Sequence, residues 1–150
     1  MSDMDSAIQL FKAMMRDQVA PELRRLGFKG SGQSFLLPSE RYWALLGFQK
    51  SMYGTRAVVK FTVNATVVDK GVWTESRENH PYLSERPKAN TLWVVGWWKR
   101  IGSLLPDPHD KWWTVTNEVE AEAAAAEVLA AIQTHVLPAM RLQMETSETA

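Results

Sequence analysis

Arginine, aspartate, histidine and tryptophan gather in one stretch of the chain, RIGSLLPDPHDKWW, from Arg100 to Trp113. The planar guanidinium of Arg100 can pair with the Asp110 carboxylate, stack on an indole ring, or bind a carboxylate or phosphate of a ligand. Pairing with Asp110 would close the loop as a structural clasp that also presents a tryptophan beside a charged rim. We therefore take Arg100 and Asp110 as the first candidates for a binding surface.

Acid–base and metal chemistry have fewer candidates. His109 stands between Asp107 and Asp110, and His80 lies in an acidic stretch further upstream, so the two imidazoles are candidates for a mixed metal site. The sequence has no cysteine, no His-Glu-x-x-His pattern, no glycine-rich phosphate loop and no Gly-x-Ser-x-Gly elbow. Because exposed loops collect aspartate and histidine anyway, we predict no metal, no cofactor and no catalytic residue. Whether the protein is an enzyme stays open, with the balance against it.

Two pairs of adjacent tryptophans frame the same region. Trp97 and Trp98 end one apolar run, and Trp112 and Trp113 begin another. Neighbouring side chains in a strand point to opposite faces, so only one indole of each pair can join a core. The other packs under a loop or forms an aromatic platform, since tryptophan is a preferred interface anchor. The sequence leaves open which member of each pair is exposed.

Composition excludes several classes of function. The 150 residues suit a single domain, residues 1–150, with one hydrophobic core. The 17 basic and 17 acidic residues cancel, and no aromatic ladder accompanies Lys60, Thr62 and Asn64, so nucleic-acid binding is disfavoured. No run reaches the roughly 18 apolar residues that span a bilayer, and the first residues lack a secretory pattern. We expect a cytoplasmic monomer or homodimer without membrane contact.

Both ends of the chain are predicted to be helical. Ser6 and Gln9 form a capping box, and Asn117 can cap a second helix whose first turn is acidic. Pro21 and Pro138 predict a kink or break in each helix, because proline lacks an N–H. Apolar residues recur at steps of three and four, which predicts these buried stripes: Ile8, Phe11, Met15, Val19, Leu23 and Leu26 in the first helix, and Ala123, Ala126, Leu129, Ile132, Val136 and Met140 in the second.

The middle of the chain has the alternation of antiparallel strands. In AVVKFTVNATVV, residues 57–68, apolar residues alternate with lysine, threonine and asparagine, which predicts a strand with one face in water. YWALLGFQKS, residues 42–51, is its predicted hairpin partner. Further strands are expected in SFLL (34–37), LWVVGWWK (92–99) and KWWTV (111–115), giving a sheet of about five strands.

Residues 69–90 show neither period, so we predict a long loop with a short helical turn around Tyr82. A helix, a meander and a closing helix indicate the α+β class. The expected architecture is a two-layer sandwich in which the N-terminal and C-terminal helices pack on one face of the antiparallel sheet.

Short motifs along nearly the whole chain resemble the bacterial domain-of-unknown-function 4304 family. The resemblance implies a small α+β domain, and it implies no activity. Its most specific part is Arg-Ile-Gly followed, after a spacer, by Asp-Lys-Trp-Trp. The motifs that carry the resemblance are Leu26–Lys29, Ser34–Phe35, Phe48–Gln49, Phe61–Asn64, Arg100–Gly102 and Asp110–Trp113.

The favoured hypothesis is a soluble bacterial interaction module, accessory or immunity-like, that binds an unidentified protein through its Trp-rich loops and the polar face of its sheet. The alternative is a small-ligand-binding protein or enzyme with a cleft between the 69–90 loop and the 100–113 loop. There Arg100 would hold an anion, and His109 or Asp110 would act on it. A third hypothesis, homodimerisation, would require a large apolar patch over Trp97 or Trp113.

Overall fold

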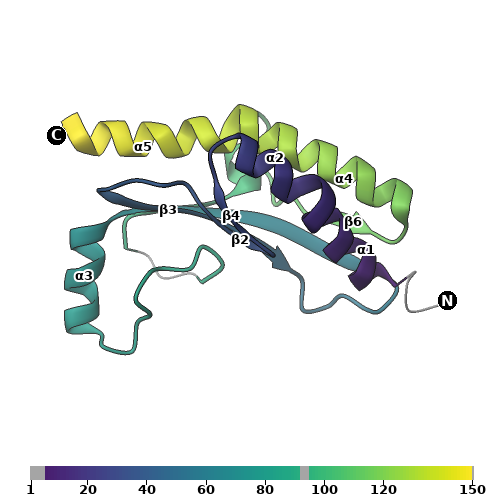
Figure 1. Ribbon diagram of the computed structural model, residues 1–150, viewed down its shortest axis with the longest axis horizontal. Helices are drawn as coiled ribbons and strands as arrows, with labels where there is room; N and C mark the ends of the chain where they lie inside the picture. The colour runs from purple at the N-terminus through teal and green to yellow at the C-terminus, as the bar shows by residue number, and fades with distance from the viewer. Residues whose placement is uncertain (1–5, 92–94, 150) are drawn as a thin grey trace.

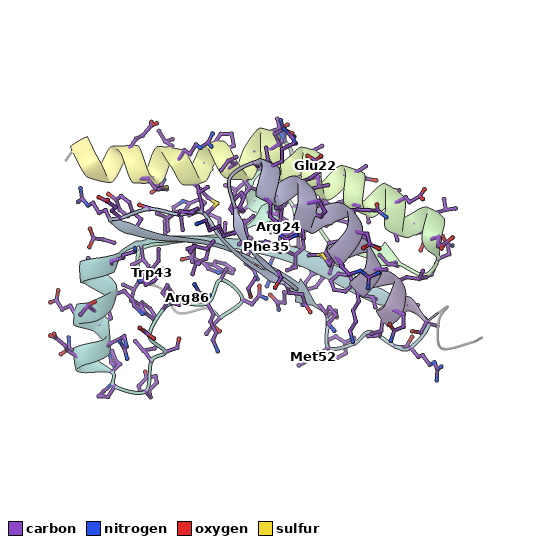
Figure 2. All side chains as sticks on the ribbon, in the orientation of Figure 1. Glu22, Arg24, Phe35, Trp43, Met52 and Arg86 are labelled. Atoms are coloured by element: carbon purple, nitrogen blue, oxygen red, sulfur yellow. The ribbon has the colours of Figure 1, made fainter. Side chains whose placement is uncertain are left out.

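The computed structural model describes residues 6–91 and 95–149, with side chains as far as residue 145. A twisted antiparallel sheet is covered on one face by two long helical arms, one from each end of the chain (Figure 1). A shorter helix and a loop lie on the other side of the sheet. Figure 2 shows Trp43 and Arg86 on that side and Glu22 and Arg24 on the side of the arms. The fold is α+β, as the sequence predicted.

Each helical arm contains a π-helical turn just before its proline. The N–H of Ala20 bonds to the carbonyl of Met15, five residues back, and Leu137 bonds to Ile132 in the same way. The wider turn lets the helix continue past a proline, so the predicted kink or break is replaced by a local change of pitch. In chain order the elements of the arms are α1 (Ala7–Met14), η2 (Met15–Val19), α2 (Ala20–Arg25), α4 (Glu118–Ala131), η4 (Ile132–Val136) and α5 (Leu137–Thr149).

Side-chain caps begin both arms where the sequence predicted them. The hydroxyl of Ser6 accepts from the Gln9 N–H, and the Asn117 side chain accepts from the Glu120 N–H. The predicted buried stripe is confirmed from Ile132 onward but wrong in α4, where the predicted alanines at 123 and 126 are exposed. The residues buried there are Ala121, Ala124, Ala125 and Val128.

The sheet has six strands, and every pairing is antiparallel. The strands follow the order β1-β2-β3-β4-β5, while β6 pairs with a second part of β4. The strands are β1 (Lys29–Ser31), β2 (Ser34–Leu36), β3 (Tyr42–Lys50), β4 (Val59–Asp69), β5 (Trp97–Arg100) and β6 (Trp113–Val115), with the 3₁₀ helix η3 (Ile101–Leu104) after β5. The predicted strand over 92–99 is thus seen only from Trp97, and residues 92–94 lie outside the described residues.

The hydrophobic core lies between the sheet and the helical arms. The ring of Phe61 on β4 lies 5.2 Å from that of Phe11 on α1 and 5.7 Å from that of Trp113 on β6, measured between ring centres. Phe11 and Phe61 are almost fully buried. Aromatic packing therefore joins the first helix, the central strand and the last strand.

The opposite face of the sheet is largely covered, contrary to the prediction, although Lys60 at the start of β4 is exposed. Thr62, Asn64 and Thr66 of β4 are 0%, 0% and 5% exposed. Thr62 bonds to the carbonyl of Lys111 in the chain between η3 and β6, and Asn64 bonds to Asn90 in the loop after the helix α3 (Lys70–Asn79). Thr66 bonds to the carbonyl of Trp97 on β5. Figure 1 shows α3 and the loop after it on this side of the sheet. The polar face that was predicted to be open is therefore covered from Thr62 to Thr66.

The helix α3 replaces the helical turn that was predicted around Tyr82. Asp69 caps it by accepting from the N–H groups of Gly71 and Val72. Tyr82 lies in a turn beyond the helix and is 73% exposed. Only Trp73 of α3 is buried, so the helix has no apolar periodicity for a sequence pattern to reveal.

The C-terminal arm, Glu118–Glu145, is the one helix of the described residues that is long and apolar enough to cross a membrane by length and composition. Ala124, Val128 and Ile132 of this arm are buried in the core. Part of the apolar stretch, 39%, is therefore packed inside the protein.

Candidate functional site around Arg100

Arg100 lies at the end of β5, on the face of the sheet opposite the helical arms. It pairs with Asn64 of β4, so both side chains leave the sheet on the same face. Arg100 Nε donates to Asn64 Oδ1 at 3.1 Å, and its Nη2 donates to Gln49 Oε1 at 3.2 Å. Gln49 comes from β3, where it pairs with Thr62. Three neighbouring strands thus contribute one polar side chain each to a small network.

Asn64 is the buried centre of this network. Its Nδ2 donates to Gln49 Oε1 at 2.7 Å and to Asn90 Oδ1 at 3.0 Å, while its oxygen accepts from Arg100. The Asn90 Nδ2 donates in turn to the carbonyl of Phe48 at 3.2 Å. An unpaired buried amide costs about 1–3 kcal/mol, and these partners remove that cost. The network therefore ties β3, β4, β5 and the loop after α3 together.

Gly102 and Thr62 position the chain that returns from η3 to β6. A Cβ atom on Gly102 would overlap the carbonyl oxygen of His109, so glycine is needed where the two segments touch. The N–H of His109 also bonds to the carbonyl of Gly102 at 3.2 Å. Thr62 Oγ1 donates to the carbonyl of Lys111 at 2.7 Å. These contacts bring Asp110 back to the neighbourhood of the guanidinium.

One carboxylate and two indole rings surround the guanidinium of Arg100. Its Cζ lies 5.3 Å from the ring centre of Trp112 and 5.9 Å from that of Trp98. Asp110 Oδ1 is 3.7 Å from Nη1, and Asp110 Oδ2 accepts from the Trp112 indole at 2.9 Å. The hydrogen bonds to Asn64 and Gln49 use two of the five guanidinium N–H groups. Since the Arg100 side chain is 31% exposed, it can still donate to a further acceptor.

Each tryptophan pair divides between the two faces of the sheet. Trp113 is 5% exposed and belongs to the core, whereas Trp112 is half-buried beside the guanidinium. Trp97 is half-buried against the core, and Trp98 is half-buried on the face of Arg100. All four indoles are at least partly packed, so none of them stands free as an aromatic platform.

The two candidate histidines do not join this cluster. The side chain of His109 is exposed, and its Nδ1 lies 2.7 Å from the carbonyl oxygen of Asp107. His80 follows the C-terminal end of α3, and its ring packs on Tyr82 at 5.7 Å. Within residues 6–91 and 95–149 there is no group of three or more histidine, aspartate or glutamate residues able to hold a metal ion. Arg100 and Asp110 meet, and no imidazole completes an acid–base pair with them.

Sequence reasoning missed three members of the cluster as site residues: Gln49, Asn64 and Asn90. A signal was present for two of them, because Gln49 and Asn64 belong to the motifs that carry the family resemblance and interrupt strongly apolar strands. Asn90 had no such signal, since it lies at the end of a long polar segment. Its role depends on where α3 places that segment.

The end of the 69–90 loop forms a pocket with elements other than those of the predicted cleft. Residues 84–91 enclose a pocket with β2 and β3, not with the 100–113 loop. Neither Arg100 nor Asp110 lines any of five pockets in the described part of the chain. The Arg100 cluster is a surface feature beside the pocket, and Asn90 touches both.

The fold and the site define a small α+β domain with a partly exposed arginine held on its sheet. The family described as Domain of unknown function (DUF4304) matches residues 19–142, and the chain belongs to this family. The resemblance inferred from the motifs is thereby confirmed. No curated protein and no solved structure matches the chain.

Proposed function

We propose that the protein is an interaction module that binds an acidic segment of a partner protein through Arg100. One observation carries the proposal. The guanidinium is held by two neutral amide oxygens and flanked by two indoles. The carboxylate of Asp110 lies 3.7 Å from Nη1, which is too far for a good hydrogen bond. A fixed arginine loses little side-chain entropy when it binds, and arginine beside tryptophan is typical of interface hot spots.

Binding is favoured over catalysis by the neighbours of Arg100. Gln49, Asn64 and the indoles supply hydrogen bonds and aromatic faces, and neither group is an effective acid, base or nucleophile near neutral pH. Asp110 is 64% exposed and hydrogen-bonded to Trp112. A protein partner is favoured over a small molecule because small-molecule sites are concave, and neither Arg100 nor Asp110 lines the five pockets described above.

The preference for an acidic partner follows from the position of Asp110. Its carboxylate already occupies the neighbourhood of Nη1, but at a distance longer than a good charge-assisted hydrogen bond. A carboxylate from a partner could approach the same N–H groups in a bidentate arrangement. In this proposal Asp110 is the internal competitor that the partner displaces. That the domain is bacterial and cytoplasmic, accessory or immunity-like, stays a prediction from the sequence.

Calorimetric titration with a soluble glutamate-rich peptide tests the proposal. We predict saturable binding that weakens as salt is added. Arg100→Gln should lower the affinity at least about tenfold, the size of a moderate hot spot. Asp110→Asn should raise it about two- to fivefold, because it removes a competing carboxylate from a partly exposed ion pair.

The control is Lys99→Gln, which removes a positive charge from the same strand on the opposite face of the sheet. It should leave the affinity almost unchanged. Equal losses in Lys99→Gln and Arg100→Gln would show a non-specific charge effect and contradict the proposal. Arg100→Gln could lose affinity simply because it unfolds. Asp110→Asn is predicted to raise the affinity, and a folding defect cannot do so.

A further inference from the structure

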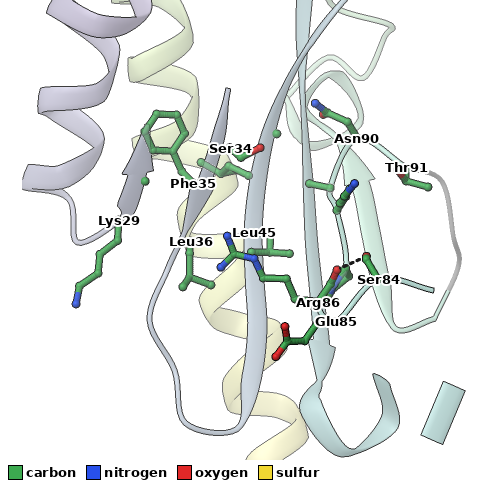
Figure 3. A pocket seen from close by; sticks show the side chains of 16 residues that line it. Lys29, Ser34, Phe35, Leu36, Leu45, Ser84, Glu85, Arg86, Asn90 and Thr91 are labelled. Carbon is green, nitrogen blue, oxygen red and sulfur yellow. Dashed lines mark hydrogen bonds between the residues drawn. The ribbon is translucent and has the colours of Figure 1, made fainter. Parts of the chain in front are cut away.

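We propose a second site, for a small soluble amphipathic anion, in the pocket between residues 84–91 and strands β2 and β3 (Figure 3). The pocket has a volume of ≈ 470 Å³. Sites for small molecules typically measure about 300–1,000 Å³. Arg100 does not line this pocket, so the proposal does not rest on the partner-binding function proposed above.

The loop that covers the pocket is fixed at both ends by tryptophans. Trp73 of α3 donates its indole N–H to the carbonyls of Ser84 and Glu85, at 3.2 Å each. Trp98 of β5 donates to the carbonyl of Ala89 at 2.8 Å. A loop held in this way keeps the pocket formed before a ligand arrives, which lowers the entropic cost of binding.

Gly47 explains how the end of the loop reaches the sheet. A Cβ atom at Gly47 would overlap the side-chain amide of Asn90, so the glycine lets Asn90 lie directly on β3. There Asn90 donates to the carbonyl of Phe48 and accepts from Asn64. The pocket is closed at this end by the same asparagine that belongs to the Arg100 cluster.

The floor of the pocket is apolar. Leu36 of β2 and Leu45 of β3 are cross-strand partners, so their side chains leave the sheet on the same face, beneath the loop. Leu36 is half-buried and Leu45 is 6% exposed. A ring or short hydrocarbon chain placed over these leucines would bury apolar surface on both sides.

The charged residues of the pocket are mainly basic. Lys29, Arg86 and Lys88 line it together with a single carboxylate, Glu85. In the part of the chain that the structure describes, none of the three basic side chains forms an ion pair. Figure 3 shows the side chain of Arg86 reaching from the loop towards Leu45. The pocket thus combines an apolar floor with uncompensated positive charge.

This combination selects the chemical class of the ligand. A carboxylate, sulfonate or phosphate would accept hydrogen bonds from Arg86 and Lys88, while the apolar part lies on the leucines. A neutral molecule of the same shape would lose the charge-assisted bonds. Because the loop lies over the leucines, a small soluble molecule reaches them more readily than the flat surface of a membrane.

The test is an NMR titration of the full chain with naphthalene sulfonate and, separately, with its neutral counterpart naphthalene methanol. We expect saturable shifts of the backbone amides in 34–36, 45–47 and 84–91, apart from Pro87, which has no N–H, with the sulfonate. The neutral compound should bind at least about tenfold more weakly. Equal binding of the two compounds, or shifts confined to the surroundings of Arg100, would overturn the proposal.

A double variant, Arg86→Gln with Lys88→Gln, isolates the role of the charges. Both side chains are exposed and unpaired, so the fold should be unaffected. The affinity for naphthalene sulfonate should fall about tenfold. Lys60→Gln, an exposed lysine of β4 outside the pocket, is the matched control and should bind like the wild type. Equal affinity in the double variant and the control would overturn the proposal, as would binding to anionic phospholipid vesicles without any binding of the soluble sulfonate.

Discussion

Replacing Gly102 with alanine tests how the loop between η3 and β6 is held. The added methyl group would overlap the carbonyl oxygen of His109 and lie 2.7 Å from the Lys111 nitrogen. The returning chain must therefore move away and strain the hydrogen bond from the His109 N–H to the Gly102 carbonyl. Overpacking typically costs about 1–3 kcal/mol, and a weakened hydrogen bond adds about 1 kcal/mol.

Alanine also has an opposite effect, since it lowers the entropy of the unfolded chain by about 0.4–1 kcal/mol. The net expectation is a loss of about 1–3 kcal/mol. For a chain of this length each kcal/mol lowers the melting temperature by roughly 2–4 °C, so Gly102→Ala should melt about 2–12 °C below the wild type. The assay is thermal unfolding followed by circular dichroism.

Ser103→Ala is the matched control, because Ser103 is the exposed neighbour of Gly102 and its only described side-chain bond is to the Arg100 carbonyl. It should cost about 1 kcal/mol or less. If Gly102→Ala melted at or above the temperature of the wild type, the close approach of His109 to η3 would be refuted. The contact between Gly102 and His109 would then not explain how Asp110 reaches Arg100.

Three further predictions concern single side chains. Trp113→Ala should lower the free energy of unfolding in urea by about 3–5 kcal/mol, because the indole is buried in the core. Trp112→Ala should lower it by only about 1 kcal/mol, because that indole is half-buried beside Arg100. Equal losses in the two variants would contradict the assignment of the two indoles to opposite faces. Asn64→Ala should lower the free energy of unfolding by about 2–3 kcal/mol, since it leaves the Nε–H of Arg100 and the side-chain oxygen of Asn90 without their partner; a neutral result would refute the network. The hydrogen bond from Arg41, followed by those from backbone N–H groups of α3, lowers the pKa of Asp69. Its contribution to stability is therefore present above the ordinary carboxyl pKa and lost as the pH falls below about 4, so acid unfolding should be less steep in Asp69→Asn.

Much of the architecture could be predicted from local patterns. The alternation in residues 57–68 identified β4 and the side chains that face the core, because one side of that strand is uniformly apolar. The caps at Ser6 and Asn117 were also readable, since capping depends on residues within one turn. In each of these features the interacting residues are close together in the sequence, and their side chains are of types typical of that structure.

Other features depend on tertiary contacts that no local pattern records. The polar side of β4 was predicted to be in water, because alternation does not show whether another segment covers the polar face. Only Trp73 of α3 is buried, so that helix has no apolar stripe. In α4 alanines occupy both the buried and the exposed side, and hydropathy therefore could not fix which side faces the core.

The candidate site was predictable in part for the same reasons. Arg100, Asp110 and Trp112 are close in the sequence, and their types suggested a clasp beside a charged rim. Asn90 and Gln49 reach the guanidinium cluster only because α3 and the β3–β4 hairpin bring them there. Long-range partners of this kind need the fold itself.

The most direct test of the central claim is to observe the Arg100 Nε–H resonance by NMR while the glutamate-rich peptide is added. The account predicts a saturable shift of this resonance together with that of the Trp112 indole N–H, and saturation at lower peptide concentration in Asp110→Asn. If the peptide binds while both resonances stay in place, Arg100 is a structural clasp only, and the proposed interaction site is wrong.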